Sequence, residues 1–418
     1  MSTPLRILIV ADTLDVDASS GAKTSLALVE SLLACGYDLK ILHYSRKEIQ
    51  IKNAATVAIK EKRTSIYYLL SKTQLLIKRT LGISLHKKTE ARRGFSYAHT
   101  YDVASIKEAL DKEKPEAYDW VLALSYAGSF RAHMALAISP SWHDKFIAYI
   151  HDPYPQHSYP RPYDWVEPGH QFKRKFFLKI SESATYMMYP SQYLGDWMES
   201  YYHNAKGKAI VIPHQIPDIS VGEQTPEFFD ATRFNILHAG SMMSARNPMA
   251  LANAFCELAL ENSDFGKDAS LIFLGTRSIF HEALEDLSKE HATIYVHPDY
   301  MNFDSVLSMQ YKTSINVVLE AKGPFSPFLP GKVPHCIKAD TPILLLSPYK
   351  SETKRLLGKS YPYWAEIDDV PTIKNHLREI YTHWKSKKGQ LTLEVEDVDT
   401  LLYYFSPAYV ADQFNALS

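Results

Sequence analysis

Cysteine is scarce in this chain. The 418 residues include only three cysteines, Cys35, Cys256 and Cys336, and no two of them form a CxxC pair. Disulfide-stabilised domains and cysteine-based zinc sites need more cysteines at closer spacing. The composition therefore argues against both and is typical of a reducing compartment. We expect a cytoplasmic protein.

Long apolar runs and an excess of one charge are also lacking. No stretch of 18 or more apolar residues occurs, so no transmembrane helix is expected. A core strand is expected at Arg6–Ala11, which leaves too little room before it for a cleavable signal. The formal net charge is −1, so the protein's overall field gives no indication of a nucleic-acid partner. A chain of this length is expected to form two domains.

Several nucleotide and metal motifs are absent. No GxGxxG follows an expected strand, and Gly21–Thr24 lacks the Gly–Lys pair and the earlier glycine of a P-loop. The 17 histidines are scattered and form no HxxxH pair with nearby acids. Asp15 and Asp17 could bind a hard cation, but their loop can equally be solvated. We expect no metal and no cofactor.

The neutral total conceals one strongly basic segment. Residues 46–93 carry 13 Lys and Arg against Glu48, Glu61 and Glu90. Within this segment, Ser65–Ile83 places apolar residues beside Lys and Arg, and as a helix it would have an apolar stripe next to a cationic one. Such a helix suits an anionic membrane surface, although a core-packing helix with solvated lysines has the same pattern. We interpret 46–93 as an insertion that follows the strand Leu39–Tyr44.

Strand-like and helix-like segments alternate along the whole chain. Many of the strand segments are apolar throughout, as in parallel sheets that are covered by helices on both faces. The pattern predicts an α/β protein with two doubly wound, Rossmann-like domains. The expected strands are Arg6–Ala11, Leu39–Tyr44, Trp120–Ser125, Phe146–Ile150, Thr185–Tyr189, Ala209–Ile212, Asn235–Ala239, Ser270–Leu274, Thr293–Val296, Thr313–Leu319 and Pro342–Leu346.

A segment rich in Pro, Gly and acid, Pro213–Arg233, marks the expected domain boundary. We predict an N-terminal domain over 1–213 that includes the basic insertion, and a C-terminal domain over 214–400. Residues 401–418 include a terminal helix, Pro407–Leu417, which can cross back onto the first domain.

The segment 234–248 (FNILHAGSMMSARNP) predicts a phosphate site. An apolar strand stops at Gly240, a loop with Arg246 follows, and Pro248 stands near the start of a helix. A glycine turn before a helix N-terminus directs unpaired N–H groups and a positive dipole end at one point. The segment 323–346 adds a second cation, Lys332, before another helix and strand. Both segments can face one ligand if their strands are neighbours.

His151 is the best candidate for a role at a reaction centre. It closes the apolar strand Phe146–Ile150 and opens a loop rich in Pro and Tyr, with Asp152 beside it. A His at the carboxyl end of a strand can orient hydroxyls or move a proton, although a His satisfied by backbone contacts would look the same.

The chain resembles the GT-B glycosyltransferases and, within them, glycosyltransferase family 4. The resemblance covers nearly the whole chain and rests on six segments in the family's order: RILIVAD with Ser20–Gly21, AYIHDPYP at 148–155, YPSQYL at 189–194, IVIPHQIPD at 210–218, ILHAGSMMSARNPMALANAF at 236–255, and FLPGKVPHCIKADTPILLL at 328–346.

The resemblance implies two domains that face a cleft, with the acceptor on the first domain and a nucleotide-sugar donor on the second. Gly21 matches the family's glycine loop, and His151 matches the His that contacts the transferred sugar. Arg246 stands where the family places a basic residue on the diphosphate, and Lys332 lies in the segment that helps to hold the nucleotide. Members usually need no metal and typically retain anomeric configuration.

The chain departs from the family at three positions. Ser241 stands where many members have Arg, while Pro327 and His335 occupy the places of the two glutamates. These changes leave open which nucleobase and which sugar the donor carries. They also leave two alternatives: a non-catalytic scaffold that binds saccharide or lipid, and an epimerase of the same fold.

We therefore expect a metal-independent, retaining glycosyltransferase of polysaccharide or glycoconjugate biosynthesis. Its acceptor would be a saccharide or a lipid-linked saccharide at the inner face of the plasma membrane. The expected site residues are, for catalysis, His151 and Asp152; for donor binding, Gly240, Ser241, Arg246, Gly275, Pro330, Gly331, Lys332 and His335; and for the acceptor or phosphate loop, Ser20 and Gly21.

Overall fold

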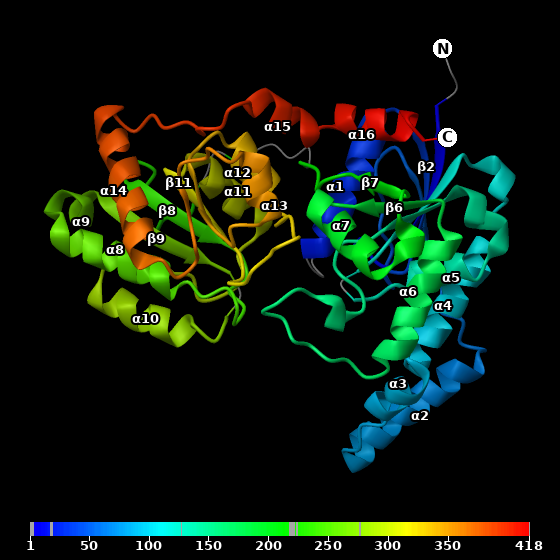
Figure 1. Cartoon of the computed structure of the whole chain (residues 1–418). Helices are drawn as coiled ribbons and strands as arrows, with labels where there is room; N and C mark the ends of the chain where they lie inside the picture. Colours follow the sequence, from blue (N-terminus) through cyan, green and yellow to red (C-terminus); the bar gives the residue numbers. More distant parts are fainter. Residues whose placement is uncertain are drawn as a thin grey trace. The chain divides into compact units, whose positions relative to one another are not determined.

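The computed structural model describes residues 4–16, 20–126, 128–216, 222, 225–275 and 277–417, and the side chain of Ser20 lies outside this description. The chain divides into two compact units, drawn in Figure 1. Unit 1 comprises Met1–Tyr159, Tyr163–Pro217 and Ser406–Ser418, and unit 2 comprises Pro160–Pro162 and Asp218–Phe405.

Unit 1 is built on a parallel sheet of seven strands in its described part, in the order β3-β2-β1-β4-β5-β6-β7. The order reverses direction between β1 and β4, which makes the carboxyl ends of these strands a place where ligands bind in such sheets. The strands are β1 (Arg6–Ala11), β2 (Asp38–His43), β3 (Ala55–Ala58), β4 (Trp120–Leu124), β5 (Phe146–Tyr149), β6 (Tyr186–Tyr189) and β7 (Ala209–Val211).

Helices cover both faces of this sheet because successive strand residues point to opposite sides. Leu8 and Val10 of β1 pack with α4, α5 and α6, whereas Ile7 and Ile9 pack with α1 and α16. The helices of unit 1 are α1 (Ser20–Ala34), α2 (Ile66–Leu81), α3 (His86–Arg93), α4 (Tyr97–Leu110), α5 (Arg131–Ala137), α6 (His170–Ser183), α7 (Gln192–Tyr201) and α16 (Pro407–Asn415), with short 3₁₀ helices at Pro115–Ala117, Pro140–Lys145, Gln156–Ser158 and His203–Ala205.

The last helix, α16, belongs to unit 1 although it follows all of unit 2 in sequence. The Oη of Tyr409 donates to the carbonyl of Val211, 3.1 Å away, and the Sγ of Cys35 lies 3.1 Å from the carbonyl of Pro407. Val410 and Phe414 are buried in the same apolar cluster as α1. The chain therefore ends by completing the core of the unit in which it begins.

Unit 2 contains a second parallel sheet, of six strands in its described part, in the order β10-β9-β8-β11-β12-β13. β8 and β11 are direct neighbours, so the segments that follow them meet at one edge of the sheet. The strands are β8 (Phe234–Ala239), β9 (Ala269–Leu274), β10 (Ile294–Val296), β11 (Ile315–Leu319), β12 (Ile343–Leu346) and β13 (Trp364–Ala365).

The helices of unit 2 also pack on its sheet through aromatic side chains. The ring of Phe234 in β8 contacts Phe265 of α9 and Tyr381 of α14, with centroids 6.0 and 5.3 Å away. The helices are α8 (Met249–Glu261), α9 (Ser263–Asp268), α10 (His281–Glu290), α11 (Phe303–Lys312), α12 (Val333–Lys338), α13 (Glu352–Leu357), α14 (Val370–Ser386) and α15 (Val398–Tyr404).

The structure confirms the α/β class and the two Rossmann-like parallel sheets. It corrects the interpretation of 46–93 as a pure insertion, since β3 lies inside that segment and pairs in parallel with β2. β3 was missed because it is a four-residue edge strand of which no residue is buried. Such a strand carries little apolar signal.

Candidate functional site

Two glycine loops meet at the carboxyl edge of the unit 2 sheet. The N–H of Gly240 donates to the carbonyl of Leu274, 2.8 Å away. A Cβ atom added to Gly275 would lie 2.4 Å from the carbonyl oxygen of Gly240, so only glycine allows this approach. The structure thus brings together Gly240 and Gly275, two of the expected donor-binding residues.

Lys332 lies at the same edge, immediately before α12. Its Nζ donates to the Nδ1 of His238, at 3.2 Å, and to the carbonyl of Val317, at 2.8 Å. A Cβ atom on Gly240 would lie 3.6 Å from this Nζ. Burial, with Arg246 adding to it, lowers the pKa of Lys332 to about 8, so the amine is charged at neutral pH. Lys332 therefore lies beside Gly240, although the strands of the two segments, β8 and β12, are not direct neighbours because β11 lies between them.

Arg246 lies in a loop that is hydrogen-bonded to the segment after β11. The N–H of Arg246 donates to Met243, at 2.7 Å, and the N–H of Lys322 donates to Ala245, at 3.0 Å. The Nε of Arg246 is buried and has no hydrogen-bond partner among the described residues. A guanidinium with an unused donor next to a second cation is suited to binding an anion.

Glu320 belongs to this site but was not predicted. It directly follows β11, is only 2% exposed, and neither carboxyl oxygen has a partner of good geometry in the described part of the chain. Burial raises the pKa of this carboxyl to about 7, although Ser326, Thr353 and Arg246 oppose the shift. The sequence signal was a lone acid at the end of an apolar strand.

His335, the residue in the place of a glutamate, is buried on α12. Its ring packs against Phe303, with centroids 5.4 Å apart, and its Nδ1 has no hydrogen-bond partner among the described residues. Burial, with Lys338 adding to it, lowers the pKa of His335 to about 4. The side chain is therefore neutral and can exchange only an ordinary hydrogen bond with a ligand.

The other three residues expected to bind the donor are Ser241, Pro330 and Gly331. Ser241 and Gly331 are exposed, and the carbonyl of Pro330 accepts from the N–H of Val333 at 2.9 Å. α8 begins at Met249, and Pro248 is its N-cap, close to the helix start as expected.

One N–H group that was expected to serve a phosphate is already used. The Oδ1 of Asn247 accepts from the N–H of Met249, 2.9 Å away. The anion-binding capacity of this edge therefore rests more on Arg246 and Lys332 than on the start of α8.

In unit 1, His151 follows β5 directly. Its Nδ1 lies 3.0 Å from the Oγ of Ser125, and its ring lies 4.2 Å from that of Tyr149 and 6.1 Å from that of His214. Its Nε2 is buried without a partner among the described residues. Burial, together with His214 and His133, holds the pKa of His151 well below its usual range. His151 is thus a neutral ring with one nitrogen unused, and Asp152 follows it as a partly exposed residue.

A buried ionic network at the carboxyl edge of the unit 1 sheet was also missed. Asp12 follows β1, and its Oδ1 accepts from the Nε of Arg131 at 3.2 Å and from the N–H of Ala132 at 3.3 Å. The Nη1 of Arg131 donates to Asp102 at 3.0 Å. Burial raises the pKa of Asp12, and Arg131 opposes that shift. Arg131 therefore joins α4, α5 and the end of β1.

The expected glycine loop at Ser20–Gly21 is instead the start of a helix. α1 begins at Ser20, and the carbonyl of Gly21 accepts from the Oγ1 of Thr24 at 3.0 Å. The hydroxyl of Thr24 thus bonds back to a carbonyl of the first turn, as threonine hydroxyls within helices do. The backbone of Gly21 is thus helical, and the side chain of Ser20 lies outside the described residues.

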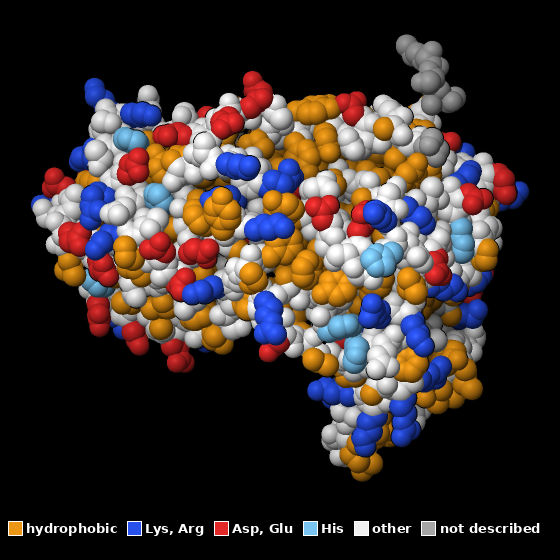
Figure 2. Space-filling view, viewed as in Figure 1, with side chains coloured by type: hydrophobic (Ala, Val, Ile, Leu, Met, Phe, Trp, Pro, Cys, Tyr) orange, Lys and Arg blue, Asp and Glu red, His pale blue; other side chains and the backbone are white. Residues whose placement is uncertain are grey.

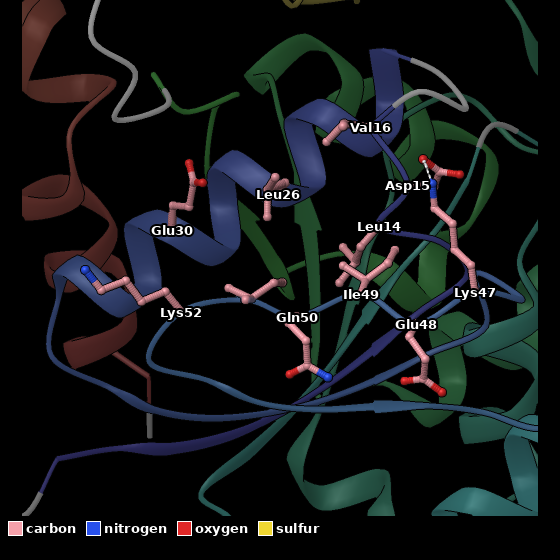
Figure 3. A pocket seen from close by; sticks show the side chains of 11 residues that line it. Leu14, Asp15, Val16, Leu26, Glu30, Lys47, Glu48, Ile49, Gln50 and Lys52 are labelled. Carbon is pink, nitrogen blue, oxygen red and sulfur yellow. Dashed lines mark ion pairs between the residues drawn. The ribbon is translucent and has the colours of Figure 1, made fainter.

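A hollow of about 380 Å³ lies between α1 and the segment 47–52 (Figure 3). Leu14, Leu26 and Ile49 line it, and Asp15 at its rim pairs with Lys47 at 2.7 Å. None of the expected site residues lines this hollow. Asp17, the second carboxylate weighed for a metal, lies outside the described residues.

Within the described ranges, no group of three or more His, Cys, Asp or Glu side chains is placed to hold a metal ion. None of the helices in those ranges is both long and apolar enough to cross a bilayer.

No protein-family model and no curated protein matches the chain. Solved structures do. A glycosyltransferase from Rickettsia africae is 12% identical, with a TM-score of 0.63 over 99% of this chain and 97% of its own. The UDP-forming alpha,alpha-trehalose-phosphate synthase of Burkholderia xenovorans, in complex with glucose-6-phosphate, is 11% identical, with a TM-score of 0.67 over 98% and 99%. A trehalose-6-phosphate protein from E. coli, bound with UDP-2-fluoro glucose, is 11% identical, with a TM-score of 0.63 over 98% of each chain.

These similarities extend over nearly the whole chain and agree with its two parallel sheets. They confirm the GT-B fold that the sequence segments indicated. At 10 to 13% identity these similarities establish the fold, and they do not identify family 4.

Proposed function

We propose that this chain transfers a glycosyl group from a nucleotide sugar to an acceptor hydroxyl. The observation that carries the proposal is the cationic edge of unit 2, where Lys332 and Arg246 adjoin the close-packed loops of Gly240 and Gly275. Similar structures with UDP-2-fluoro glucose or glucose-6-phosphate bound support a sugar nucleotide and a saccharide as the two substrates.

The two cations suit the charge that the reaction develops. The bond between the anomeric carbon and the diphosphate oxygen breaks, the acceptor oxygen bonds to that carbon, and the acceptor proton leaves to solvent or to the diphosphate. Negative charge grows on the leaving diphosphate, and preorganised cations stabilise it. We propose a metal-independent transfer with retention, as in family 4, with Arg246 and Lys332 on the diphosphate.

His151 would position the transferred sugar in this proposal. Its neutral ring and unused Nε2 can exchange a hydrogen bond with a sugar hydroxyl without adding charge. Asp152, next to it, would take part in the same contacts. The acceptor we propose is a saccharide or a lipid-linked saccharide of cell-envelope or glycoconjugate biosynthesis, used by a cytoplasmic enzyme at the inner face of the membrane.

A non-catalytic protein that binds saccharide or lipid is the second candidate. It is favoured by the absence of the acidic pair, since His335 is a buried neutral ring and Pro327 has no ionisable group. A protein of this kind is expected to bind its ligand without turnover.

Incubation of the purified chain with a panel of nucleotide sugars and saccharide acceptors separates the two. Transfer, or slow release of the nucleotide from one donor, supports the enzyme, and Arg246→Ala is expected to abolish it while the fold remains intact. Near-normal turnover of Arg246→Ala would remove that residue from the mechanism. Saccharide binding without donor binding would favour the scaffold.

A further inference from the structure

The helical arm formed by α2 (Ile66–Leu81) and α3 (His86–Arg93) exposes an unusual amount of apolar surface. No residue of either helix is buried. Ile66 is 67% exposed, Leu69 66% and Leu76 60%. Exposed apolar residues scattered singly are normal, but a row of them on one element marks an interaction surface.

These side chains form one stripe along α2. Ile66, Leu69, Thr73, Leu76 and Thr80 are spaced alternately by three and four residues, which places them on a single helix face. The hydroxyls of the two threonines donate to the carbonyls of Leu69, at 3.0 Å, and Leu76, at 2.9 Å. Because helix carbonyls accept from these hydroxyls, burial of the stripe in an apolar phase would leave neither hydroxyl proton without a hydrogen bond.

The opposite side of α2 fastens the arm to unit 1. The ring of Tyr68 packs edge-on against Tyr101 of α4, with centroids 5.2 Å apart. The Nε2 of Gln74 donates to the Oγ1 of Thr89 in α3 at 2.7 Å. Figure 1 shows the two helices extending together beyond α4 and α6. The stripe therefore belongs to the face of α2 that unit 1 does not use.

The arm also carries a strong excess of positive charge. Glu90 is the acidic residue in its two helices, and none of the arm's cations forms an ion pair with a described residue. Figure 2 shows Lys and Arg side chains interleaved with hydrophobic ones over this part of the molecule. The cations are Lys72, Lys78, Arg79, Lys87, Lys88, Arg92 and Arg93.

We propose that the α2–α3 arm is a docking surface for an anionic phospholipid bilayer, with the apolar stripe in the interface and the cations against the headgroups. A helix lies in the interface plane when apolar and cationic faces adjoin, and each Lys or Arg near an anionic surface adds attraction. Docking to the bilayer would bring the enzyme to a membrane-anchored acceptor, and in this respect the inference rests on the proposed function. Binding of the arm to the bilayer does not itself require a nucleotide-sugar donor.

A second copy of the chain fits this surface less well. Two arms that met through their stripes would bring two unpaired cationic borders together, and like charges at close range repel. An anionic bilayer instead supplies a counter-charge for each cation and an apolar phase for the stripe. Charge complementarity thus selects the bilayer among the possible occupants.

Flotation of the full chain with vesicles tests the proposal. We expect binding to vesicles of phosphatidylglycerol and phosphatidylcholine at low salt, little binding to phosphatidylcholine alone, and release at high salt. The double substitution Leu69→Ser with Leu76→Ser, and separately Lys87→Glu with Lys88→Glu, should each lower binding at least about tenfold. Leu260→Ser, at a leucine that is 80% exposed, and Lys387→Glu with Lys388→Glu serve as matched controls outside the arm.

Equal vesicle binding by the arm variants and the wild type would overturn the proposal, as would no binding to anionic vesicles. Loss of a dimer in size-exclusion chromatography of the leucine variant, without vesicle binding by the wild type, would assign the stripe to a second copy. Thermal melting of each variant reports whether it folds. Vesicle binding with no donor binding would leave the docking surface standing and reject the glycosyltransferase, whereas donor turnover without vesicle binding would do the reverse.

Discussion

The Nζ of Lys332 lies 3.2 Å from the Nδ1 of His238, which links the start of α12 to β8 across 94 residues of sequence. A protonated Lys332 donates this hydrogen bond, so the Nδ1 of His238 accepts it and the His proton sits on Nε2. Burial and the Lys332 charge hold the pKa of His238 well below its usual range. The pair therefore presents one positive charge beside Gly240.

Replacement of Lys332 by Met is expected to weaken nucleotide-sugar binding by about tenfold or more, because a charge-assisted hydrogen bond is lost. Affinity of the wild type should also fall as the pH rises through 8, since Lys332 loses its proton there. Titration calorimetry from pH 7 to 9 checks both points. Lys338→Met, at the exposed end of the same helix, is the control, and a wild-type affinity in Lys332→Met would contradict the assignment.

Gly275→Ala is expected to damage the donor site through shape alone. The added Cβ would lie 2.4 Å from the carbonyl oxygen of Gly240, so one of the two loops must move. Gly222→Ala is a matched control because its Cβ would meet no atom within 4 Å. Donor affinity and melting temperature should both fall in Gly275→Ala and hold in the control; equal values in the two variants would show that the contact is unimportant.

Glu320→Gln is expected to stabilise the protein at alkaline pH. The unfolded carboxyl loses its proton near pH 4.5, while burial keeps Glu320 protonated in the folded chain until about pH 7. The unfolded state therefore gains from ionisation first, and the wild type loses up to about 3 kcal/mol between these values. The neutral amide avoids this loss.

Urea denaturation of Glu320→Gln and the wild type at pH 5 and pH 8 measures the effect. The variant should be more stable at pH 8, with a much smaller difference at pH 5, and Glu282→Gln, at an exposed site, should show neither change. A pH-independent difference would mean that Glu320 does not titrate in this range.

Arg131→Met is expected to destabilise unit 1 by about 3 kcal/mol or more, because it leaves the buried Asp12 without its cation, whereas Asp102 keeps Arg46. Adding Asp12→Asn should recover part of the loss by removing this buried charge. Arg6→Met, which breaks an exposed pair with Asp38, should cost far less. Denaturation midpoints of the four proteins decide the matter, and a loss equal to that of Arg6→Met would rule out a structural role for the network.

Local pattern was enough to predict most of the fold and to select several of the residues proposed for donor binding. Apolar strands such as β8 and β12 were recognisable from their residues, and the glycine that ends β8 marked the loop of Gly240. Lys332 was found because it stands just before a helix in a segment with few other charges. Parallel sheets covered on both faces follow from apolar strands without alternation.

The missed residues depend on neighbours that are distant in sequence. Asp12 and Arg131 are 119 residues apart and meet only because β1 lies beside β4 in the sheet. Glu320 looked like an ordinary acid after a strand, and its burial near Ser326, Thr353 and Arg246 is a property of the packed site. A lone acid that ends a buried strand was the shared signal of Asp12 and Glu320.

Donor binding tests the central claim most directly. Thermal shift of the wild type against a panel of nucleotides and nucleotide sugars should show one donor that raises the melting temperature, since a ligand of the folded state stabilises it. The same donor should give little shift with Arg246→Ala or Lys332→Met. If no nucleotide or nucleotide sugar shifts the melting temperature, and titration calorimetry detects no binding, the cationic edge of unit 2 is not a donor site.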